Sequence, residues 1–261
     1  MYEAYWGFAR SPFSARAVRE SLAASPVHAE ALARLDFLLS SRSPLGLLLG
    51  ECGSGKSAVL AVFAERATRA GALACRIAAA AAGEEHVLPA LAEALGVAES
   101  GERLVLWRRL VDRLAELRFE GVSAAVLLDD LDRAAPTTLA LVERLLAVVD
   151  APLTIVASAR PDAAPRIGRR LLEQVALRIE LTPWNEAESR EHLQRSLEGA
   201  GRTQPAFEKA AVRRLIELSA GAPRRLNQLA QLALLAGAGQ RLSLVDERTI
   251  DAVHDELSTV S

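Results

Sequence analysis

The chain has few cysteines and few aromatic residues, and each shortage excludes a class of protein. Only Cys52 and Cys75 are cysteines among 261 residues, so there is no disulfide framework, and a reducing cytoplasm is the natural setting. The four histidines, at positions 28, 86, 192 and 254, have no metal-ligand spacing, and we assign no chemistry to His28. Aromatic residues are 4% of the chain and hydrophobic residues 51%, so the core must be mainly aliphatic.

The chain also lacks long apolar runs and an excess of either charge. No stretch reaches the roughly 18 uninterrupted apolar residues of a membrane span, and the first residues hold no apolar core of signal-peptide length, so we expect no direct membrane insertion. The formal net charge is −2. Bulk charge therefore does not indicate nucleic-acid binding, although a local basic patch would still allow a DNA contact.

Apolar patterning predicts alternating strands and helices in the first two thirds of the chain. An irregular segment at residues 1–24 comes first and carries Tyr5, Trp6, Phe8 and Phe13. Short apolar runs predict strands near residues 45–49, 72–78, 122–128, 153–158 and 175–181. Helices are expected after Ser25-Pro26 and near residues 56–70, 84–95, 103–119 and 136–149. This alternation favours an α/β fold in which helices cover both faces of a parallel sheet.

After Pro183 the pattern changes to helices alone. We expect them near residues 186–197, 206–219, 223–236 and 246–257, with glycines separating the first three. A domain boundary is placed near Pro183 because strand signals of comparable strength stop there. The predicted organisation is an N-terminal segment at 1–24, a core domain at 25–183 and a helical domain at 184–261.

The most specific motif lies between the first predicted strand and the helix that follows it. Its eight residues are Gly50, Glu51, Cys52, Gly53, Ser54, Gly55, Lys56 and Ser57, and they match the phosphate-loop pattern G-x-x-x-x-G-K-S in full. Glycines let consecutive backbone N–H groups point at phosphate oxygens, and the helix N-terminus adds its dipole. We therefore predict that the loop binds ATP, with Lys56 on the β- and γ-phosphates and the Ser57 hydroxyl on Mg²⁺.

Two acidic residues follow the apolar run Ala124–Leu128. A buried strand that ends in a carboxylate can present it to the metal opposite a phosphate loop. Asp129 is the predicted Mg²⁺ ligand, through a bound water, and Asp130 would polarise the attacking water. Many ATPases carry glutamate at the second position, and aspartate is one methylene shorter, so its reach to that water is reduced.

Three further segments resemble one family along the whole chain. They are Tyr5-Trp6-Gly7-Phe8 with Pro12-Phe13, then Ser25-Pro26 with His28 and Glu30-Ala31-Leu32, and finally Gly221 with Pro223-Arg224-Arg225-Leu226-Asn227. Together with the phosphate loop they resemble the bacterial secretion-pathway protein A ATPases of the ExeA type. That family belongs to the AAA+ ATPases and is related to the ATPase subunits of some transposons.

The resemblance implies a five-stranded parallel sheet, a helical lid at 184–261, and ATP held between them. It implies that Ser158 is a polar sensor near the γ-phosphate, although a serine at a strand end is also typical of a helix cap or turn. It implies that Arg224 reaches the phosphates from the lid, with Arg225 as the alternative. The aromatic N-terminal segment would pack on the sheet near the adenine, or serve as ordinary core.

The chain departs from the family in two places that bear on function. The best known members continue into a membrane span and a peptidoglycan-binding region, and the sequence to Ser261 has neither, so a cell-wall role is expected to need a partner. Gln174 stands where the family usually carries the arginine finger. The nearby Arg166, Arg169 and Arg170 could supply a displaced finger, a DNA contact or a solvated helix face.

Two functions of different kinds follow from these residues. The first is an AAA+ ATPase whose hydrolysis of Mg-ATP drives a conformational cycle in a protein partner or a homo-oligomer. The second is a nucleotide-switched regulator with slow turnover that binds DNA or protein, as the transposition ATPase subunits do. Asp130 and Gln174 favour the second function, and the intact phosphate loop allows both.

Overall fold

The computed structural model describes residues 2–98 and 101–258, which form two compact units. The unit that we call the sheet unit consists of Ala29–Gly50 and Lys56–Leu181. The unit that we call the helical unit consists of the described residues of Met1–His28, Glu51–Gly55 and Thr182–Ser261.

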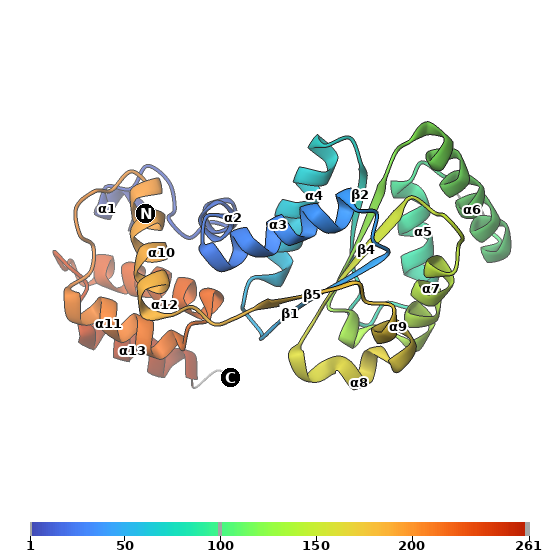
Figure 1. Ribbon diagram of the computed structural model, residues 1–261. Coiled ribbons are helices and arrows are strands. Elements are labelled where there is room, and N and C mark those ends of the chain that lie inside the picture. Colours follow the sequence, from blue (N-terminus) through green and yellow to red (C-terminus); the bar gives the residue numbers. More distant parts are fainter. Residues whose placement is uncertain (1, 99–100, 259–261) are drawn as a thin grey trace. The chain divides into compact units, whose positions relative to one another are not determined.

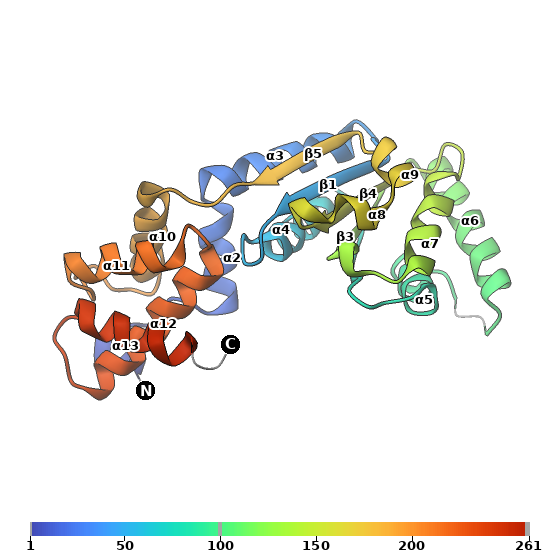
Figure 2. The ribbon, with the colours of Figure 1, turned by 90° about the horizontal axis from the view of Figure 1, so that it is seen from below.

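The sheet unit is built on five parallel strands, as the sequence predicts (Figure 1). The strands are β1 (Leu45–Gly50), β2 (Leu73–Ala78), β3 (Ala124–Asp129), β4 (Leu153–Ala159) and β5 (Leu177–Leu181). Their order in the sheet is β2-β3-β4-β1-β5, and Figure 2 shows β1 beside β5. Because all five strands are parallel, their carboxyl ends meet at one edge of the sheet, where ligands bind in open α/β sheets.

Helices cover both faces of this sheet. They are α3 (Pro26–Ser40, whose first turn belongs to the helical unit), α4 (Lys56–Arg69), α5 (Glu84–Ala94), α6 (Arg103–Glu120), α7 (Pro136–Leu146), α8 (Ala164–Ile167) and α9 (Arg169–Glu173), with short 3₁₀ turns η1 (Leu131–Arg133) and η2 (Pro161–Ala163). The α4 helix contacts β1, β2 and β3. The predicted three-layer arrangement is therefore confirmed.

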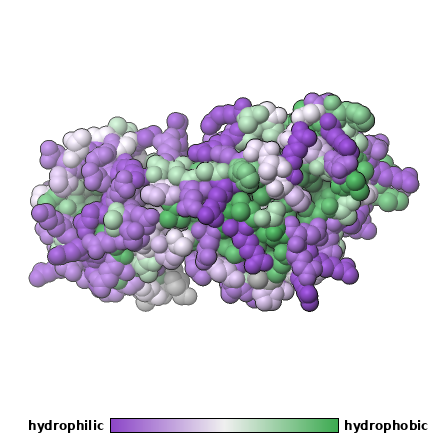
Figure 3. Space-filling model, in the orientation of Figure 1, coloured by the Kyte–Doolittle hydropathy of each residue, from purple (hydrophilic) through white to green (hydrophobic). Residues whose placement is uncertain are grey.

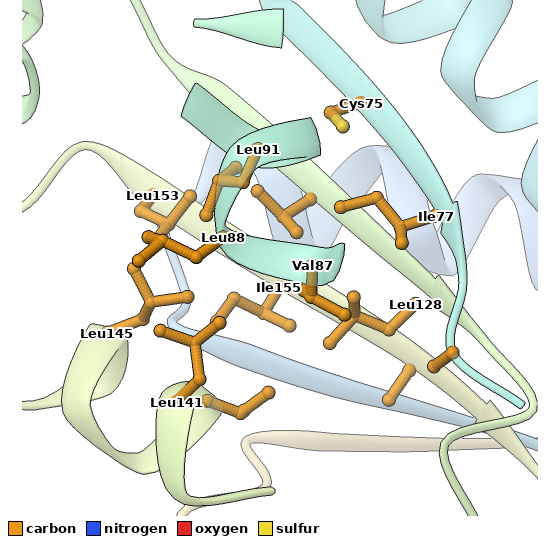
Figure 4. Packing of buried hydrophobic residues seen from close by; sticks show 14 of the residues in the cluster. Cys75, Ile77, Val87, Leu88, Leu91, Leu128, Leu141, Leu145, Leu153 and Ile155 are labelled. Atoms are coloured by element: carbon orange, nitrogen blue, oxygen red, sulfur yellow. The ribbon is translucent and has the colours of Figure 1, made fainter. Parts of the chain in front are cut away.

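The core on one side of the sheet is aliphatic, as the scarcity of aromatic residues requires. Figure 4 shows Val87, Leu88 and Leu91 of α5 against side chains of the strands and of α7. Along β3, Val126 and Leu128 belong to this cluster, while the alternate residues turn to the other face and are also buried. Burial on both faces explains why β3 is a continuous apolar run.

The helical unit holds the four helices that the sequence predicts after Pro183. They are α10 (Glu186–Gly199), α11 (Lys209–Ser219), α12 (Pro223–Gly239) and α13 (Glu247–Ser258), and α12 contacts each of the other three. The expectation of an irregular N-terminal segment is wrong, because α1 (Tyr2–Trp6) and α2 (Ala15–Ala23) lie there. The Ser14 side chain caps α2 by accepting from the Ala17 N–H.

The N-terminal aromatic residues pack within the helical unit. Trp6 is buried, its indole N–H donates to the Leu234 carbonyl over 2.8 Å, and a Cβ at Gly237 would lie 3.1 Å from its ring. The Tyr5 hydroxyl donates to the Leu242 carbonyl over 2.9 Å. Trp6 of α1 is thus a core residue packed against α12, which favours the alternative of ordinary core packing, and a place for the segment near the adenine stays a prediction. The domain division at residues 24 and 183 stays a prediction, since the structure groups Glu51–Gly55 with the helical unit.

A helix that crosses a lipid bilayer must be both long and apolar. Within residues 2–98 and 101–258, no helix combines the length and the apolar character that crossing a membrane requires. Figure 3 shows hydrophilic residues over much of the face in view, with hydrophobic residues gathered in patches between them.

Candidate functional site

The loop between β1 and α4 forms a tight turn. Gly53 and Gly55 have φ angles of 81° and 100°, a region that glycine enters without the steric penalty of a side chain. The Ser54 N–H donates to the Glu51 carbonyl over 3.1 Å. Since α4 begins at Lys56, the first N–H groups of that helix lack partners within the helix and can bind an anion.

Lys56 carries a positive charge into the base of this loop. The residue is 7% exposed, and its Nζ donates to the Gly50 carbonyl over 2.6 Å. The next residue, Ser57, is exposed on the first turn of α4, and its carbonyl accepts from Arg76 over 3.1 Å. A buried ammonium and an exposed hydroxyl on adjacent residues suit a site for a phosphate and its metal ion.

The two acidic residues at the end of β3, Asp129 and Asp130, contact Ser158 of the neighbouring strand β4. Ser158 is fully buried, its hydroxyl donates to Asp129 Oδ1 over 2.6 Å, and it accepts from the Asp130 N–H over 2.9 Å. The serine therefore fixes both the carboxylate of Asp129 and the backbone of Asp130. This contact accounts for a buried hydroxyl at the strand end, while the sensor role of Ser158 stays a prediction.

Asp130 adopts an unusual backbone conformation at this edge. Its φ is 57° and its ψ is 49°, in the left-handed region, which costs roughly 1 kcal/mol for most residues and less for aspartate or asparagine. Such strain persists where the surrounding structure holds it, and it is frequent at functional sites. Here the hydrogen bond to Ser158 holds it, and the Asp130 side chain stays partly exposed.

Asp132 is a polar residue of this edge that the sequence analysis missed. Its carboxylate is 1% exposed, Oδ2 accepts from Arg160 Nε over 3.1 Å, and Oδ1 has no hydrogen-bond partner within the described part of the chain. This ion pair joins η1 to the residue after β4. The available signal was position, because Asp132 and Arg160 each lie two residues beyond Asp130 and Ser158.

In the helical unit, the start of α12 lies against the loop. The Arg224 N–H donates to the Gly53 carbonyl over 3.1 Å, and a Cβ at Gly53 would lie 3.0 Å from the Arg224 Cβ. The Arg224 side chain is exposed, whereas Arg225 donates from Nη2 to His254 Nδ1 over 2.8 Å. The structure thus places Arg224 beside the loop and engages Arg225 with α13. A role for Arg224 on the phosphates stays a prediction.

The structure places the predicted finger position at the end of α9. Gln174 is exposed and donates from Nε2 to the Arg170 carbonyl over 3.3 Å. Arg169 pairs with Glu173 over 2.7 Å on the same short helix and is 92% exposed. Arg166 is also exposed. These local contacts do not decide among a displaced finger, a DNA contact and a solvated face.

Neither the cysteines nor the histidines form a metal centre. Across residues 2–98 and 101–258, no group of three or more His, Cys, Asp or Glu residues could hold a metal ion. Cys52 is exposed in the loop and Cys75 is buried, and both are free thiols. Burial raises the pKa of Cys75 to about 11, so its thiol stays protonated at neutral pH.

Comparison with known proteins agrees with this arrangement. Residues 39–167, which contain the loop, Asp129, Asp130 and Ser158, match the family model described as an AAA domain. Over these residues the chain resembles the AAA family. It is 28% identical over 247 residues to General secretion pathway protein A of Aeromonas hydrophila, with 90% of this chain and 45% of the relative covered. The expected resemblance is confirmed, and the chain spans less than half of that relative.

Several solved structures have the same fold. Cdc6p of Pyrobaculum aerophilum superposes with a TM-score of 0.69 at 17% identity, covering 90% of this chain and 67% of that one. ORC2 of Aeropyrum pernix gives 0.66 at 18%, covering 95% and 72%. The RuvB Holliday junction branch migration motor of Thermotoga maritima gives 0.60 at 16%, covering 88% and 68%. At these identities the likeness concerns the fold alone.

Proposed function

We propose that this AAA+ chain binds Mg-ATP at the loop from Gly50 to Ser57 and hydrolyses it to drive a conformational change in a partner assembly. The observation that carries the proposal is the pair of strand ends in the sheet unit. Lys56 follows β1, and the Ser158 hydroxyl holds Asp129 and the Asp130 backbone where β3 and β4 end. A cation for phosphate and carboxylates for metal and water thus share one edge of the sheet.

The residues present fit both ATP and its metal ion. The positive φ angles of Gly53 and Gly55 give the loop a backbone turn in which N–H groups can point at phosphate oxygens. The Ser57 hydroxyl and the Asp129 carboxylate are oxygen ligands of the kind that Mg²⁺ prefers. Held by these residues, Mg²⁺ would supply positive charge that neutralises the negative charge developing on the phosphates.

The chemistry assigned to the chain is positioning and charge, without a covalent step. Lys56 would hold the β- and γ-phosphates, and Asp130 would orient the attacking water in line with the bond that breaks. Ser158 would keep Asp129 and Asp130 in place through the two hydrogen bonds described above. Arg224, beside the loop at the start of α12, would add positive charge to the phosphates from the helical unit.

The partner is proposed from the relative's name. A chain similar to a general secretion pathway protein would act with a protein partner or a homo-oligomer at the cytoplasmic side of such a pathway. A second function, a slow, nucleotide-switched regulator that binds DNA or protein, is favoured by Gln174. A finger arginine can contribute roughly 10³–10⁵ in rate, and a neutral glutamine cannot supply its charge.

The test is phosphate release from ATP per subunit at rising protein concentration, with and without DNA. For the isolated protein we expect slow turnover that depends on Mg²⁺, is absent in Lys56→Ala, and rises in Gln174→Arg. A steep rise with concentration that vanishes in Arg169→Ala or Arg170→Ala would instead identify a displaced finger. A rate equal to that of Lys56→Ala under every condition would contradict hydrolysis. Salt-sensitive DNA binding would then support the regulator.

A further inference from the structure

A buried histidine contacts the loop from the helical unit. His28 is 1% exposed, and its Nε2 lies 2.9 Å from the Ser54 carbonyl oxygen. A Cβ built on Gly55 would lie 2.5 Å from the same nitrogen. The imidazole thus lies directly against the peptide that joins Ser54 to Gly55, and glycine at position 55 leaves room for it.

The hydrogen bonds of His28 determine which nitrogen carries the proton. Burial lowers its pKa, although the Ser54 carbonyl and Glu188 act in the opposite direction, so the ring is neutral at pH 7. A neutral imidazole has one N–H and one acceptor nitrogen. Since a carbonyl only accepts, Nε2 donates to Ser54. Nδ1 must then accept from the Ser25 hydroxyl, 2.6 Å away.

An aromatic contact with Trp184 also restricts the His28 ring. The Trp184 ring lies edge-on to it, with centroids 5.6 Å apart. Trp184 is 5% exposed and lies between the end of β5 and the start of α10. The ring is therefore held by a hydrogen bond at each nitrogen and by an aromatic neighbour, so its orientation is well defined.

A fixed carbonyl has a consequence for the neighbouring N–H. In a planar trans peptide the C=O and the N–H of the same unit point in opposite directions. With the Ser54 carbonyl held toward His28, the Gly55 N–H must point away from it. Glycine has no side chain to oppose a rotation of this peptide, so the hydrogen bond to His28 supplies the restraint that the loop sequence lacks.

We propose that His28 is a positioning residue for the nucleotide: it pins the Ser54–Gly55 peptide so that the Gly55 N–H faces the phosphate, and Ser25 fixes the tautomer that allows this. The proposal rests on the proposed ATP site and adds a residue outside the phosphate-loop motif and the matched AAA domain. His28 would not touch the nucleotide. It would act through the backbone of the loop.

The chain offers a matched control in His192. This residue is also 1% exposed, its ring lies 4.7 Å from Trp184, and its two nitrogens bond to Ser21 and Asn227. His192 thus shares the burial, the bonding and the aromatic neighbour of His28, and its two bonds go to α2 and α12 instead of the loop. A comparison of the two histidines separates loop positioning from general packing.

The first experiment measures the dissociation constant of Mg-ATP by calorimetry. His28→Leu removes the donor at similar volume and is expected to weaken ATP binding about tenfold, because it leaves the buried Ser54 carbonyl unpaired. His28→Gln places an amide donor at similar reach and should restore the dissociation constant to within about threefold of the parent. His192→Leu should leave it within about twofold.

The second experiment reads the tautomer in the intact protein. Long-range ¹H–¹⁵N spectra should show several histidine rings with a protonated Nε2 and a bare Nδ1, because Nε2 of His192 faces the Asn227 Oδ1 acceptor. The ring of His28 is identified as the one whose signals are absent from His28→Gln, and we expect these signals to shift when Mg-ATP is added to the parent. Because the tautomer is read in the parent protein, the result does not depend on how well a variant folds. A protonated Nδ1 on His28, or signals unchanged by ATP in a protein that binds it, would overturn the proposal.

The outcomes also separate this inference from the ATP site itself. If Lys56→Ala loses ATP binding and His28→Leu keeps the parent's affinity, the site stands and the role of His28 is wrong. Equal losses in His28→Leu and His192→Leu would show that packing alone is responsible, which also overturns it. If the parent itself binds no ATP, the proposed function fails first.

Discussion

The carboxyl edge of the sheet and the interior of the helical unit both hold polar side chains in an aliphatic protein, but they hold them differently. At the edge the polar groups carry charge: Asp129 and Asp130 stay partly exposed, and Lys56 and Asp132 are buried with hydrogen-bond partners. In the helical unit, His28 and His192 are buried, and burial lowers the pKa of each so that they stay neutral. Charged groups at the edge are proposed to act on a ligand, whereas the neutral histidines are proposed to position other parts of the protein.

Replacing Asp130 should give the largest effect on kcat among the residues of these two regions. Asparagine also tolerates the left-handed backbone of this position, so Asp130→Asn should fold, bind Mg-ATP like the parent, and lose at least about a hundredfold in kcat. Asp130→Glu should match or exceed the parent rate if the shorter side chain limits catalysis. Turnover and calorimetric affinity check both variants, and parent-like turnover in Asp130→Asn would remove the water-orienting role.

Replacing Arg224 of the helical unit is expected to lower turnover less than replacing Asp130 does. Arg224→Ala should reduce turnover by about tenfold, since a charge-assisted hydrogen bond to phosphate would be lost. Arg225→Ala is the matched control, because the Arg225 side chain bonds to His254, and it should change turnover by less. Steady-state kinetics at saturating ATP decides between them. The reverse order of effects would assign the phosphate contact to Arg225.

The buried His192 should affect the pH dependence of the free energy of unfolding and not the rate of ATP turnover. Burial, Arg195 and His28 lower its pKa to about 4 from 6.5, although the bond to Asn227 opposes this. Between those values the unfolded chain binds more protons than the folded one, so the free energy of unfolding falls as pH drops from about 6.5 to about 4. At pH 5 this amounts to roughly 2 kcal/mol.

Urea denaturation of the parent and of His192→Leu at pH 7 and pH 5 measures this difference. The variant lacks the group and should lose less stability on acidification than the parent does. His86→Ala, at an exposed histidine, is the control and should lose as much as the parent. An identical pH dependence in parent and His192→Leu would show that His192 is not held neutral by the fold.

The sheet unit follows from the sequence much more completely than the helical unit does. All five strands were predicted. A strand buried on both faces is a continuous apolar run, as in β3, while the edge strands β2 and β5 keep exposed residues between buried ones. The loop and the acidic residues were found because their chemistry requires a fixed local spacing. Ser158 was found only through the family resemblance, since a serine at a strand end has several local explanations.

The missed features depend on contacts between distant segments. His28 and Ser54 are 26 residues apart, and His192 and Asn227 are 35 apart, so no local pattern joins them. The ion pair of Asp132 and Arg160 likewise arises only when β3 and β4 lie side by side. The helices α1 and α2 were missed because five and nine residues are too few for a clear apolar period.

The binding of Mg-ATP to the parent and to Lys56→Ala, measured by calorimetry at equal protein concentration, tests the central claim most directly. Lys56 is buried at the base of the loop, and the account predicts Mg²⁺-dependent, saturable binding of one ATP per parent chain. It also predicts that Lys56→Ala loses this binding while it keeps the parent's circular dichroism spectrum. Equal ATP affinity in the two proteins, or none in a folded parent, would contradict the assignment of this loop as the nucleotide site.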